Sequence, residues 1–155
     1  MTESKTRLPM DVTDMAWLHE RSNQPVDLKD PGKWMLFYRN EKMNEKWQLA
    51  VDLYRKGVLT GVVNMKCSTA YDNDRSSDSS EGVIILYCNN STDETTIMNI
   101  GRNIINQFGY TDKRNIYYKT DSQTMVGTGG TGVLRNHSYR LPTQIQPHLR
   151  GKCLI

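Results

Sequence analysis

A chain of 155 residues with 37% hydrophobic residues is long enough for one domain with its own core, and a mean hydropathy of −0.66 leaves room for loops and a tail. The formal net charge of +3 and the isoelectric point near 8.7 are too mild to identify a nucleic-acid-binding protein from charge alone. No apolar run reaches the ~20 residues of a membrane helix and no secretory signal opens the chain, so we expect a cytoplasmic protein without a membrane partner, with the nucleus as the alternative location.

The first half of the sequence predicts a flexible arm, two helices and two strands. The arm is residues 1–10, which show no hydrophobic period, and a short helix is expected over 11–19, where capping residues precede apolar ones. The aromatic run at 33–38 lies between turn residues and predicts a strand. Apolar side chains recur at helical spacing in 45–56, and a glycine follows them, which predicts a helix. The β-branched run 58–67 predicts the next strand.

The middle of the sequence predicts a loop, a central strand and a long helix. Residues 70–81 are rich in Ser and Asp and have no apolar period, so we expect a mobile loop there. The continuous apolar run 82–88 is typical of a strand inside a sheet. Ser91 and Glu94 have the spacing of a capping box, and the helix that they open places isoleucines on one face and ends at Gly109.

The last third of the sequence is basic and predicts short strands around a glycine-rich connection. A strand is expected at 115–119. The glycine-rich segment 127–132 lacks the strand and helix that would aim N–H groups at a phosphate, so it is predicted to be a hairpin connection. Two further short strands are expected at 133–135 and 138–141.

This order of elements predicts an α+β fold, in which a curved, largely antiparallel sheet is backed by two or three helices on one face. The domain is expected to span 11–141, with a C-terminal tail at 142–155. Trp34 and Trp47 occupy apolar positions of a strand and a helix, so both are predicted to pack in the core.

The histidines and cysteines predict no metal site. The three residues of each type lie singly along the chain and show no metal-ligand spacing. No P-loop and no nucleophile-elbow motif is present. We therefore expect neither a metal nor another cofactor. The residues are His19, His137, His148, Cys67, Cys88 and Cys153.

Two segments, 66–69 and 119–124, each place a lysine among small hydroxyl residues where a predicted strand gives way to a loop. An ammonium group with three donors, together with short hydroxyl donors, is the set of groups that a phosphate needs. If the two strands lie close in the sheet, the two lysines can contact the same phosphate. Two arginines could then bind the phosphate through bidentate hydrogen bonds, and a tyrosine could stack on a base. The alternative is that these lysines are solvated strand ends. The candidate ligand-binding residues are Lys66, Ser68, Thr69, Tyr118, Lys119, Asp121, Thr124, Arg135 and Arg140.

Read together in their order, several short motifs resemble the basophilic leukaemia-expressed protein family. They are the segments 32–37, 66–69 and 117–124, together with Trp47, and the resemblance covers roughly residues 14–140. It implies a fold similar to translation initiation factor 4E, the messenger-RNA cap binder, which is a curved antiparallel sheet backed by helices. The lysine and hydroxyl residues that match the family pattern coincide with the candidate phosphate site.

The resemblance implies the fold more strongly than the function, because fold alone does not determine function. Cap binding needs two aromatic side chains around a cationic base and an acid on its edge. The acid-rich segment 72–81 has no tryptophan. No cap-stacking tryptophan is therefore transferred to this sequence.

Two functions of different class fit these residues. The first is a nucleotide- or RNA-binding protein that holds phosphate in a basic, hydroxyl-rich cleft, with Tyr117 or Tyr118 stacking on a base. The second is a metal-independent phosphodiesterase acting on RNA or a cyclic nucleotide. A protein partner contacting the acidic segment is left open, and whether the chain is an enzyme stays undecided. The catalytic candidates of the second hypothesis are Lys66, Tyr118, Lys119 and His137.

Overall fold

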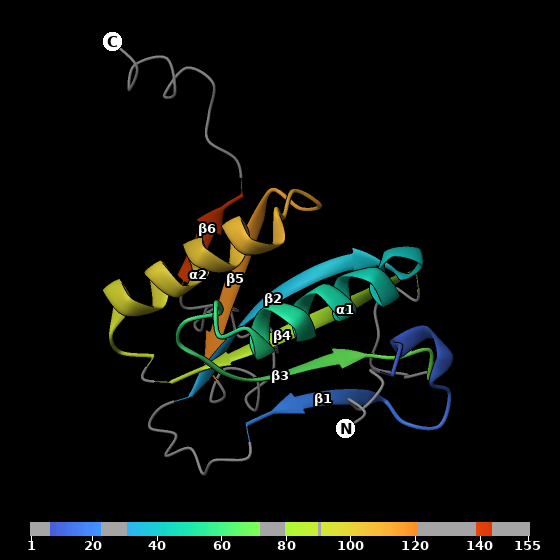
Figure 1. Cartoon of the computed structure of the whole chain (residues 1–155). Helices are drawn as coiled ribbons and strands as arrows, with labels where there is room; N and C mark the ends of the chain where they lie inside the picture. Colours follow the sequence, from blue (N-terminus) through green and yellow to red (C-terminus); the bar gives the residue numbers. More distant parts are fainter. Residues whose placement is uncertain (1–6, 23–30, 72–79, 90, 121–138, 144–155) are drawn as a thin grey trace, which may run out of the picture.

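The computed structural model describes residues 7–22, 31–71, 80–89, 91–120 and 139–143. Within these ranges the chain forms one curved six-stranded antiparallel sheet with two α-helices on one face (Figure 1). This confirms the predicted α+β fold and the placement of the helices on one side. Neither described helix combines the length and the apolar composition that crossing a membrane requires.

The strands are arranged in the order β1-β3-β4-β2-β5-β6, so β4 and β2 are the inner pair. The apolar run that predicted a central strand is β4, which pairs with β3 on one side and with β2 on the other. The strand bounds are Trp17–Arg21 for β1, Gly32–Arg39 for β2, Val62–Ser68 for β3, Glu81–Cys88 for β4, Asn115–Thr120 for β5 and Tyr139–Pro142 for β6.

The helical elements are a 3-10 turn, η1 (Pro9–Asp11), and the helices α1 (Asn40–Arg55) and α2 (Glu94–Phe108). Both predicted long helices are confirmed. Helix α1 begins earlier than predicted, directly after β2, because Met43 adds a buried side chain to its apolar stripe. This side chain packs against the backbone of β4 at Gly82.

The helix predicted for residues 11–19 is wrong, because this segment pairs with the sheet. The turn η1 ends at Asp11, and β1 begins at Trp17. Leu18 is buried on the helix-bearing side of the sheet, while His19 is exposed on the other side. That is the two-residue alternation of a strand, and pairing with β3 outweighs the weak helical pattern.

The start of α2 also differs from the prediction. Asp93 is the N-cap, and its carboxylate accepts a hydrogen bond from the Thr96 N–H at 3.2 Å. Ser91 is instead buried, with its hydroxyl oxygen 2.7 Å from Tyr118 Oη. The end of the helix is as predicted, at Gly109, which adopts the left-handed conformation with φ 59°.

The core lies between the sheet and the helices, and it contains both predicted tryptophans. Trp34 is 0% exposed and Trp47 is 1% exposed. Trp34 Nε1 donates to the Ile97 carbonyl of α2 at 3.1 Å, and its ring packs edge-on against Tyr118 with centroids 5.4 Å apart. A Cβ atom at Gly101 would lie 2.6 Å from the Trp34 ring, so this glycine allows α2 to approach β2 closely.

The predicted boundaries shift by a few residues where side chains of neighbouring segments contact each other. Pro9 is buried and its carbonyl accepts from the Ala70 N–H at 3.0 Å, so the packed domain begins before residue 11. The strand predicted from residue 58 begins at Val62, because residues 59–62 form a turn closed by the hydrogen bond from the Val62 N–H to the Leu59 carbonyl at 3.1 Å. The predictions for 72–79, 127–132 and 133–135 lie outside the described residues.

Candidate functional site

Side chains alternate between the two faces of a sheet, so the strand registers decide which predicted site residues share a face. Lys66 of β3 stands opposite Ile85 of β4, and Ile85 stands opposite Met35 of β2. Lys33, two residues before Met35, stands opposite Lys119 of β5. The three lysines therefore project from the same face, which is the one that carries neither α1 nor α2. We call it the lysine face.

Lys66 and Lys119 share this face, but they are not neighbours. Strands β4 and β2 lie between β3 and β5, so three strand spacings, or about 14 Å across the sheet, separate the two lysines. The Lys66 ammonium also lies against Trp17 of β1, on the side away from β5. The expected convergence of the two lysines on one phosphate is therefore not observed, and a ligand that contacts both must extend across the sheet.

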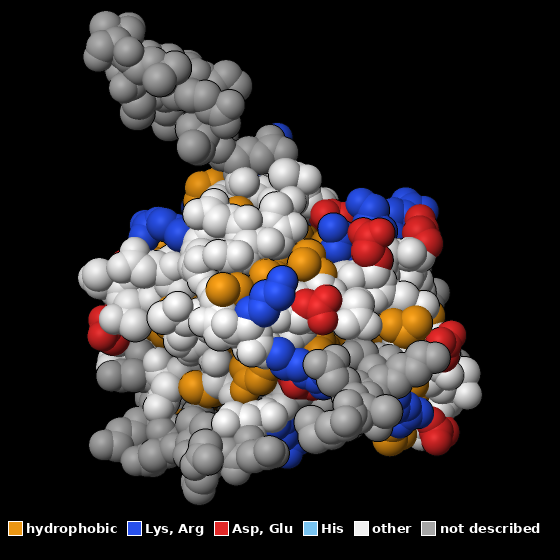
Figure 2. Space-filling view, viewed as in Figure 1, with side chains coloured by type: hydrophobic (Ala, Val, Ile, Leu, Met, Phe, Trp, Pro, Cys, Tyr) orange, Lys and Arg blue, Asp and Glu red, His pale blue; other side chains and the backbone are white. Residues whose placement is uncertain are grey.

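Positive charge dominates the lysine face. Among the described strand residues, the registers place six Lys or Arg residues there and one acid, Glu81. This acid stands at the end of β4, and its carboxylate lies 2.6 Å from Lys113 Nζ. The helix-bearing face mixes both signs of charge (Figure 2). The six cations are Arg21, Lys33, Arg39, Lys66, Lys119 and Arg140.

Aromatic rings lie between the cations of this face. Lys66 Nζ is 4.1 Å from the centroid of the Trp17 ring and 5.8 Å from that of Tyr87. Lys33 Nζ is 5.7 Å from the same Tyr87 centroid. All three distances are within the ~6 Å over which a ring attracts an ammonium group. We call Trp17, Lys66, Tyr87, Lys33 and Lys119 the aromatic–lysine row, which crosses β1, β3, β4, β2 and β5.

Lys33 and Lys119 form a like-charge pair on adjacent strands. Directly opposed residues of an antiparallel pair have Cβ atoms about 4.5–5.5 Å apart, and like charges there are destabilising. Lys33 is only 8% exposed, and burial increases the cost of an ammonium charge. An anion bound over this pair would be attracted by both ammonium groups.

The hydroxyl groups of the two residues at the end of β3 form hydrogen bonds within the protein. Ser68 Oγ accepts a hydrogen bond from the Val83 N–H at 2.9 Å. The Thr69 hydroxyl donates to the Met15 carbonyl and accepts from the Tyr71 N–H at 3.1 Å. Because both the donor and an acceptor site of Thr69 are used, the structure argues against its predicted role in ligand binding.

Tyr118 does not belong to the lysine face, which corrects its predicted role. Its ring is 0% exposed on the helix-bearing side, where it packs against Trp34 and its hydroxyl pairs with Ser91. In this position it can neither stack on a bound base nor transfer a proton at the lysine face. Tyr117 projects to the lysine face instead and stands opposite Arg140 of β6.

The described structure thus places Lys66, Lys119 and Arg140 on one face, and this face also carries residues that were not predicted. Lys33 and Tyr87 were missed, because each lies within an apolar or aromatic stretch that is typical of the core, and Trp17 was not included among the candidate ligand-binding residues. The available signal was the alternation within the strand at 33–38, which separates Lys33 from the buried Trp34. The predicted residues that lie outside the described residues are Asp121, Thr124, Arg135 and His137.

His19 lies close to two cations of the lysine face. It stands opposite Lys66, and its Nδ1 atom is 3.1 Å from the Arg21 guanidinium. Burial, followed by the charges of Arg21 and Lys66, lowers the pKa of His19 below its ordinary value of 6.5. Protonation of the ring is therefore less favourable in the folded protein than in the unfolded chain.

The stability contributed by neutral His19 is expected to be present above pH 6.5 and to be lost as the pH falls through its folded pKa. Below pH 6.5 the unfolded chain binds more protons at this residue than the folded protein does, so acid favours unfolding. Urea unfolding of the wild type and of His19→Asn across this range measures the effect. The variant should lose less stability on acidification, and equal losses would show that His19 is not coupled to the cations.

The described cysteines provide no reactive thiol. Cys67 and Cys88 are buried and free. Burial raises the pKa of both thiols, that of Cys88 to about 12, so neither forms a thiolate at neutral pH. Over the described ranges, no three His, Cys, Asp or Glu side chains come together as a group that could hold a metal ion.

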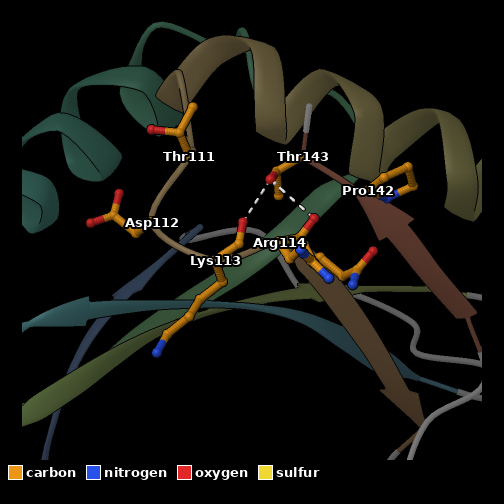
Figure 3. Close-up of a pocket in the computed structure, with 7 residues that line it drawn as sticks. Thr111, Asp112, Lys113, Arg114, Pro142 and Thr143 are labelled. Atoms are coloured by element: carbon orange, nitrogen blue, oxygen red, sulfur yellow. Dashed lines mark hydrogen bonds between the residues drawn. The ribbon is translucent and has the colours of Figure 1, made fainter. Parts of the chain in front are cut away.

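A hollow of about 690 Å³ lies at the other end of β5 and β6, beside the segment 111–115 (Figure 3). The Thr143 hydroxyl bonds there to the carbonyls of Lys113 and Arg114, at 2.6 and 3.1 Å. The Lys113 side chain extends away from Thr143, and Asp112 pairs with Lys42 at 3.0 Å. We take the lysine face as the candidate site, because it brings cations from several strands together with aromatic rings.

Solved structures with a similar fold include translation initiation factors. Schistosome eIF4E complexed with m7GpppG and 4E-BP is 16% identical with a TM-score of 0.55, and the alignment covers 72% of this chain and 59% of that one. Ascaris suum eIF4E-3 with m7G cap is 11% identical with a TM-score of 0.54, covering 74% and 59%. C. elegans eIF4E-3 with the 4E-binding protein Mextli and cap analog is 9% identical with a TM-score of 0.55, covering 72% and 57%. At these identities the likeness establishes the fold, and the aligned region is less than two thirds of each factor.

The family of the chain follows from a match to a family model. That model, of basophilic leukemia-expressed protein Bles03, matches residues 28–127, which is more than half of the chain and includes β2 to β5. No curated protein gives a match. The chain belongs to the family of basophilic leukemia-expressed protein Bles03, as the order of its short motifs predicted.

Proposed function

We propose that this protein binds a nucleotide or RNA through its lysine face, with Lys33, Lys66 and Lys119 as the phosphate contacts. The observation that carries the proposal is the placement of three lysines from three strands on one face, two of them directly opposed, where Glu81 is the one acid among the described strand residues. Phosphate groups supply the negative charge that such a face attracts, and lysine is a common phosphate ligand. Tyr117, which replaces Tyr118 in this role, lies on the same face as a stacking candidate.

The fold supports a nucleotide as the ligand. The similar factors from schistosome, Ascaris suum and C. elegans are complexes with m7GpppG, an m7G cap and a cap analog. Two of these complexes also contain 4E-binding proteins, which keeps a protein partner open for this chain. Since a shared fold does not determine function, the proposal depends on the lysines of this chain rather than on the likeness.

Binding without cleavage is the function that we propose. The phosphodiesterase hypothesis required Tyr118 or His137 to transfer protons. Tyr118 is buried on the opposite side of the sheet, and His137 lies outside the described residues. No observation therefore favours turnover over binding.

The test is a titration of the full chain with mono-, di- and cyclic nucleotides and with capped and uncapped RNA. The double variant Lys66→Ala/Lys119→Ala is expected to lower the affinity for RNA by at least about 100-fold, since each hydrogen bond to a charged group contributes about 1.5–3 kcal/mol. The slope of log K against log salt concentration should fall by about 0.7 for each lysine removed. Mass analysis after incubation should recover the ligand intact.

A matched control is available on the helix-bearing side. Lys42→Ala/Lys56→Ala removes the same two charges from α1 and its C-cap, and both positions are exposed. This double variant should keep the wild-type affinity and salt slope. Absence of binding to every ligand, or equal losses in the two double variants, would overturn the proposed function.

A further inference from the structure

We propose that the ligand of the lysine face is a single-stranded nucleic acid of at least two nucleotides, lying across the strands along the aromatic–lysine row. The inference rests on the proposed function and specifies its ligand class. It starts from an alternation of side chains, in which ring, ammonium, ring and ammonium follow one another from Trp17 to Lys33. The like-charge pair with Lys119 ends the row.

The alternation matches the covalent order of a single strand. Base and phosphate groups alternate along the chain, and an unpaired base can stack on an aromatic ring while its phosphate pairs with a cation. Lys66 lies between the rings of Trp17 and Tyr87, at 4.1 and 5.8 Å from their centroids. That is where the phosphate joining two stacked bases would be. A base on Trp17 is placed on the ring face turned away from the Lys66 ammonium.

The next phosphate is placed at the other side of Tyr87. Lys33 lies 5.7 Å from this ring and stands opposite Lys119, so two ammonium groups flank the position. Two adjacent ammonium groups attract a phosphate more strongly than one lysine does. Arg140 and Tyr117 continue the same face on β6 and β5, in the direction in which a longer strand would extend.

The spacing of the row disfavours smaller and paired ligands. Lys66 and Lys119 are three strand spacings apart, about 14 Å, so a mononucleotide placed at either end would leave the other end without a phosphate. A duplex would present phosphates, but its bases are stacked on each other and cannot lie on Trp17 or Tyr87. An acidic peptide would supply carboxylates without flat rings, so it would not use the aromatic positions.

The test measures affinity against ligand length and strandedness for the full chain. RNA and DNA single strands of one to about six nucleotides, a blunt RNA duplex of about 12 base pairs and a polyglutamate peptide are titrated under the same salt conditions. Affinity is expected to rise about 5- to 150-fold when a second base is added, as one further base stacks. The duplex and the peptide should bind more weakly than the longest single strand.

Variants of the row identify the stacking residues. Trp17→Ala and Tyr87→Ala are each expected to weaken binding of the single strand about 5- to 150-fold. Tyr54→Ala, which removes a half-buried tyrosine from α1 on the other side of the sheet, serves as the control and should not change the affinity. Far-ultraviolet circular dichroism and thermal unfolding confirm that each variant is folded.

Intrinsic fluorescence gives a second readout of the same contact. Trp34 and Trp47 are at most 1% exposed, so a bound base can stack only on Trp17 among the three tryptophans. Single-stranded ligand should therefore quench the emission of the wild type, and the quenching should be absent in Trp17→Ala. Quenching that persists in this variant would contradict the placement of a base on Trp17.

The outcomes separate this inference from the proposed function. If no nucleotide or nucleic acid binds, the proposed function fails and the inference fails with it. If a mononucleotide binds as tightly as the longest strand, or the duplex binds as well as the single strand, the proposed function stands and the inference is overturned. Tighter binding of the peptide than of any nucleic acid would overturn both. Comparison of the RNA and DNA arms shows which single strand is preferred.

Discussion

Replacing Trp34 with alanine is expected to lower the free energy of unfolding by about 3–5 kcal/mol. The side chain is 0% exposed and lies between β2 and α2, so its removal leaves a cavity at the centre of the core. It also leaves the Ile97 carbonyl without the indole donor at 3.1 Å. Urea unfolding followed by circular dichroism measures the loss, and a change in midpoint at constant slope assigns it to stability.

The control is the corresponding substitution on the opposite face of the sheet. Trp17 is half-buried on β1, so Trp17→Ala should cost less than about 1.5 kcal/mol. The two variants thus separate the two uses of tryptophan in this protein, since Trp34→Ala should reduce stability and Trp17→Ala should reduce ligand binding. Equal losses of stability would contradict the assignment of Trp17 to the lysine face.

Tyr110→Phe is expected to lower the free energy of unfolding by about 2–4 kcal/mol, although it removes a single oxygen atom. The pairing of β2 with β5 ends at Met35 and Tyr117, so the backbone of Phe37 has no partner from β5. The Tyr110 hydroxyl takes that place, donating to the Phe37 carbonyl at 2.7 Å and accepting from the Phe37 N–H at 3.0 Å. The variant leaves two backbone groups unsatisfied beside a side chain that is 1% exposed.

Tyr54→Phe provides the matched comparison for this effect. The Tyr54 hydroxyl donates a hydrogen bond to the Val63 carbonyl at 2.7 Å, and its side chain is half-buried. Its loss should cost about 1 kcal/mol, as for a typical hydrogen bond. Both variants are measured by urea unfolding. If Tyr110→Phe lowers the free energy of unfolding no more than Tyr54→Phe does, the hydroxyl of Tyr110 does not replace the strand partner that Phe37 lacks on the β5 side.

Local patterns were sufficient for the parts of the fold whose signal lies within one segment. The apolar run 82–88 predicted an inner strand, and the spacing of isoleucines before Gly109 predicted α2 and its end. The pattern failed at 11–19, where a few apolar residues fit a helix as well as a strand. It also failed at Ser91, because the buried contact of its hydroxyl with Tyr118 comes from a distant strand.

The candidate site was predictable only in part, because it also depends on contacts between segments that are distant in the sequence. The sequence left open whether Tyr117 or Tyr118 would stack on a base. Pairing with β2 decides it, since Trp34 and Tyr118 stand opposite each other on the helix-bearing side. The lysine of 33–38 looked like part of a core strand until its register placed it opposite Lys119.

The sequence by itself determined the α+β class, the family, the inner strand, both long helices and the burial of Trp34 and Trp47. It also identified the lysines near the ends of two strands. Only the tertiary structure decided that Lys66 and Lys119 share a face, that β4 and β2 hold them apart, and that aromatic rings lie between the cations. The reason is that strand order and register are set by hydrogen bonds between segments far apart in the chain, and a shift of one residue would move every side chain to the other face.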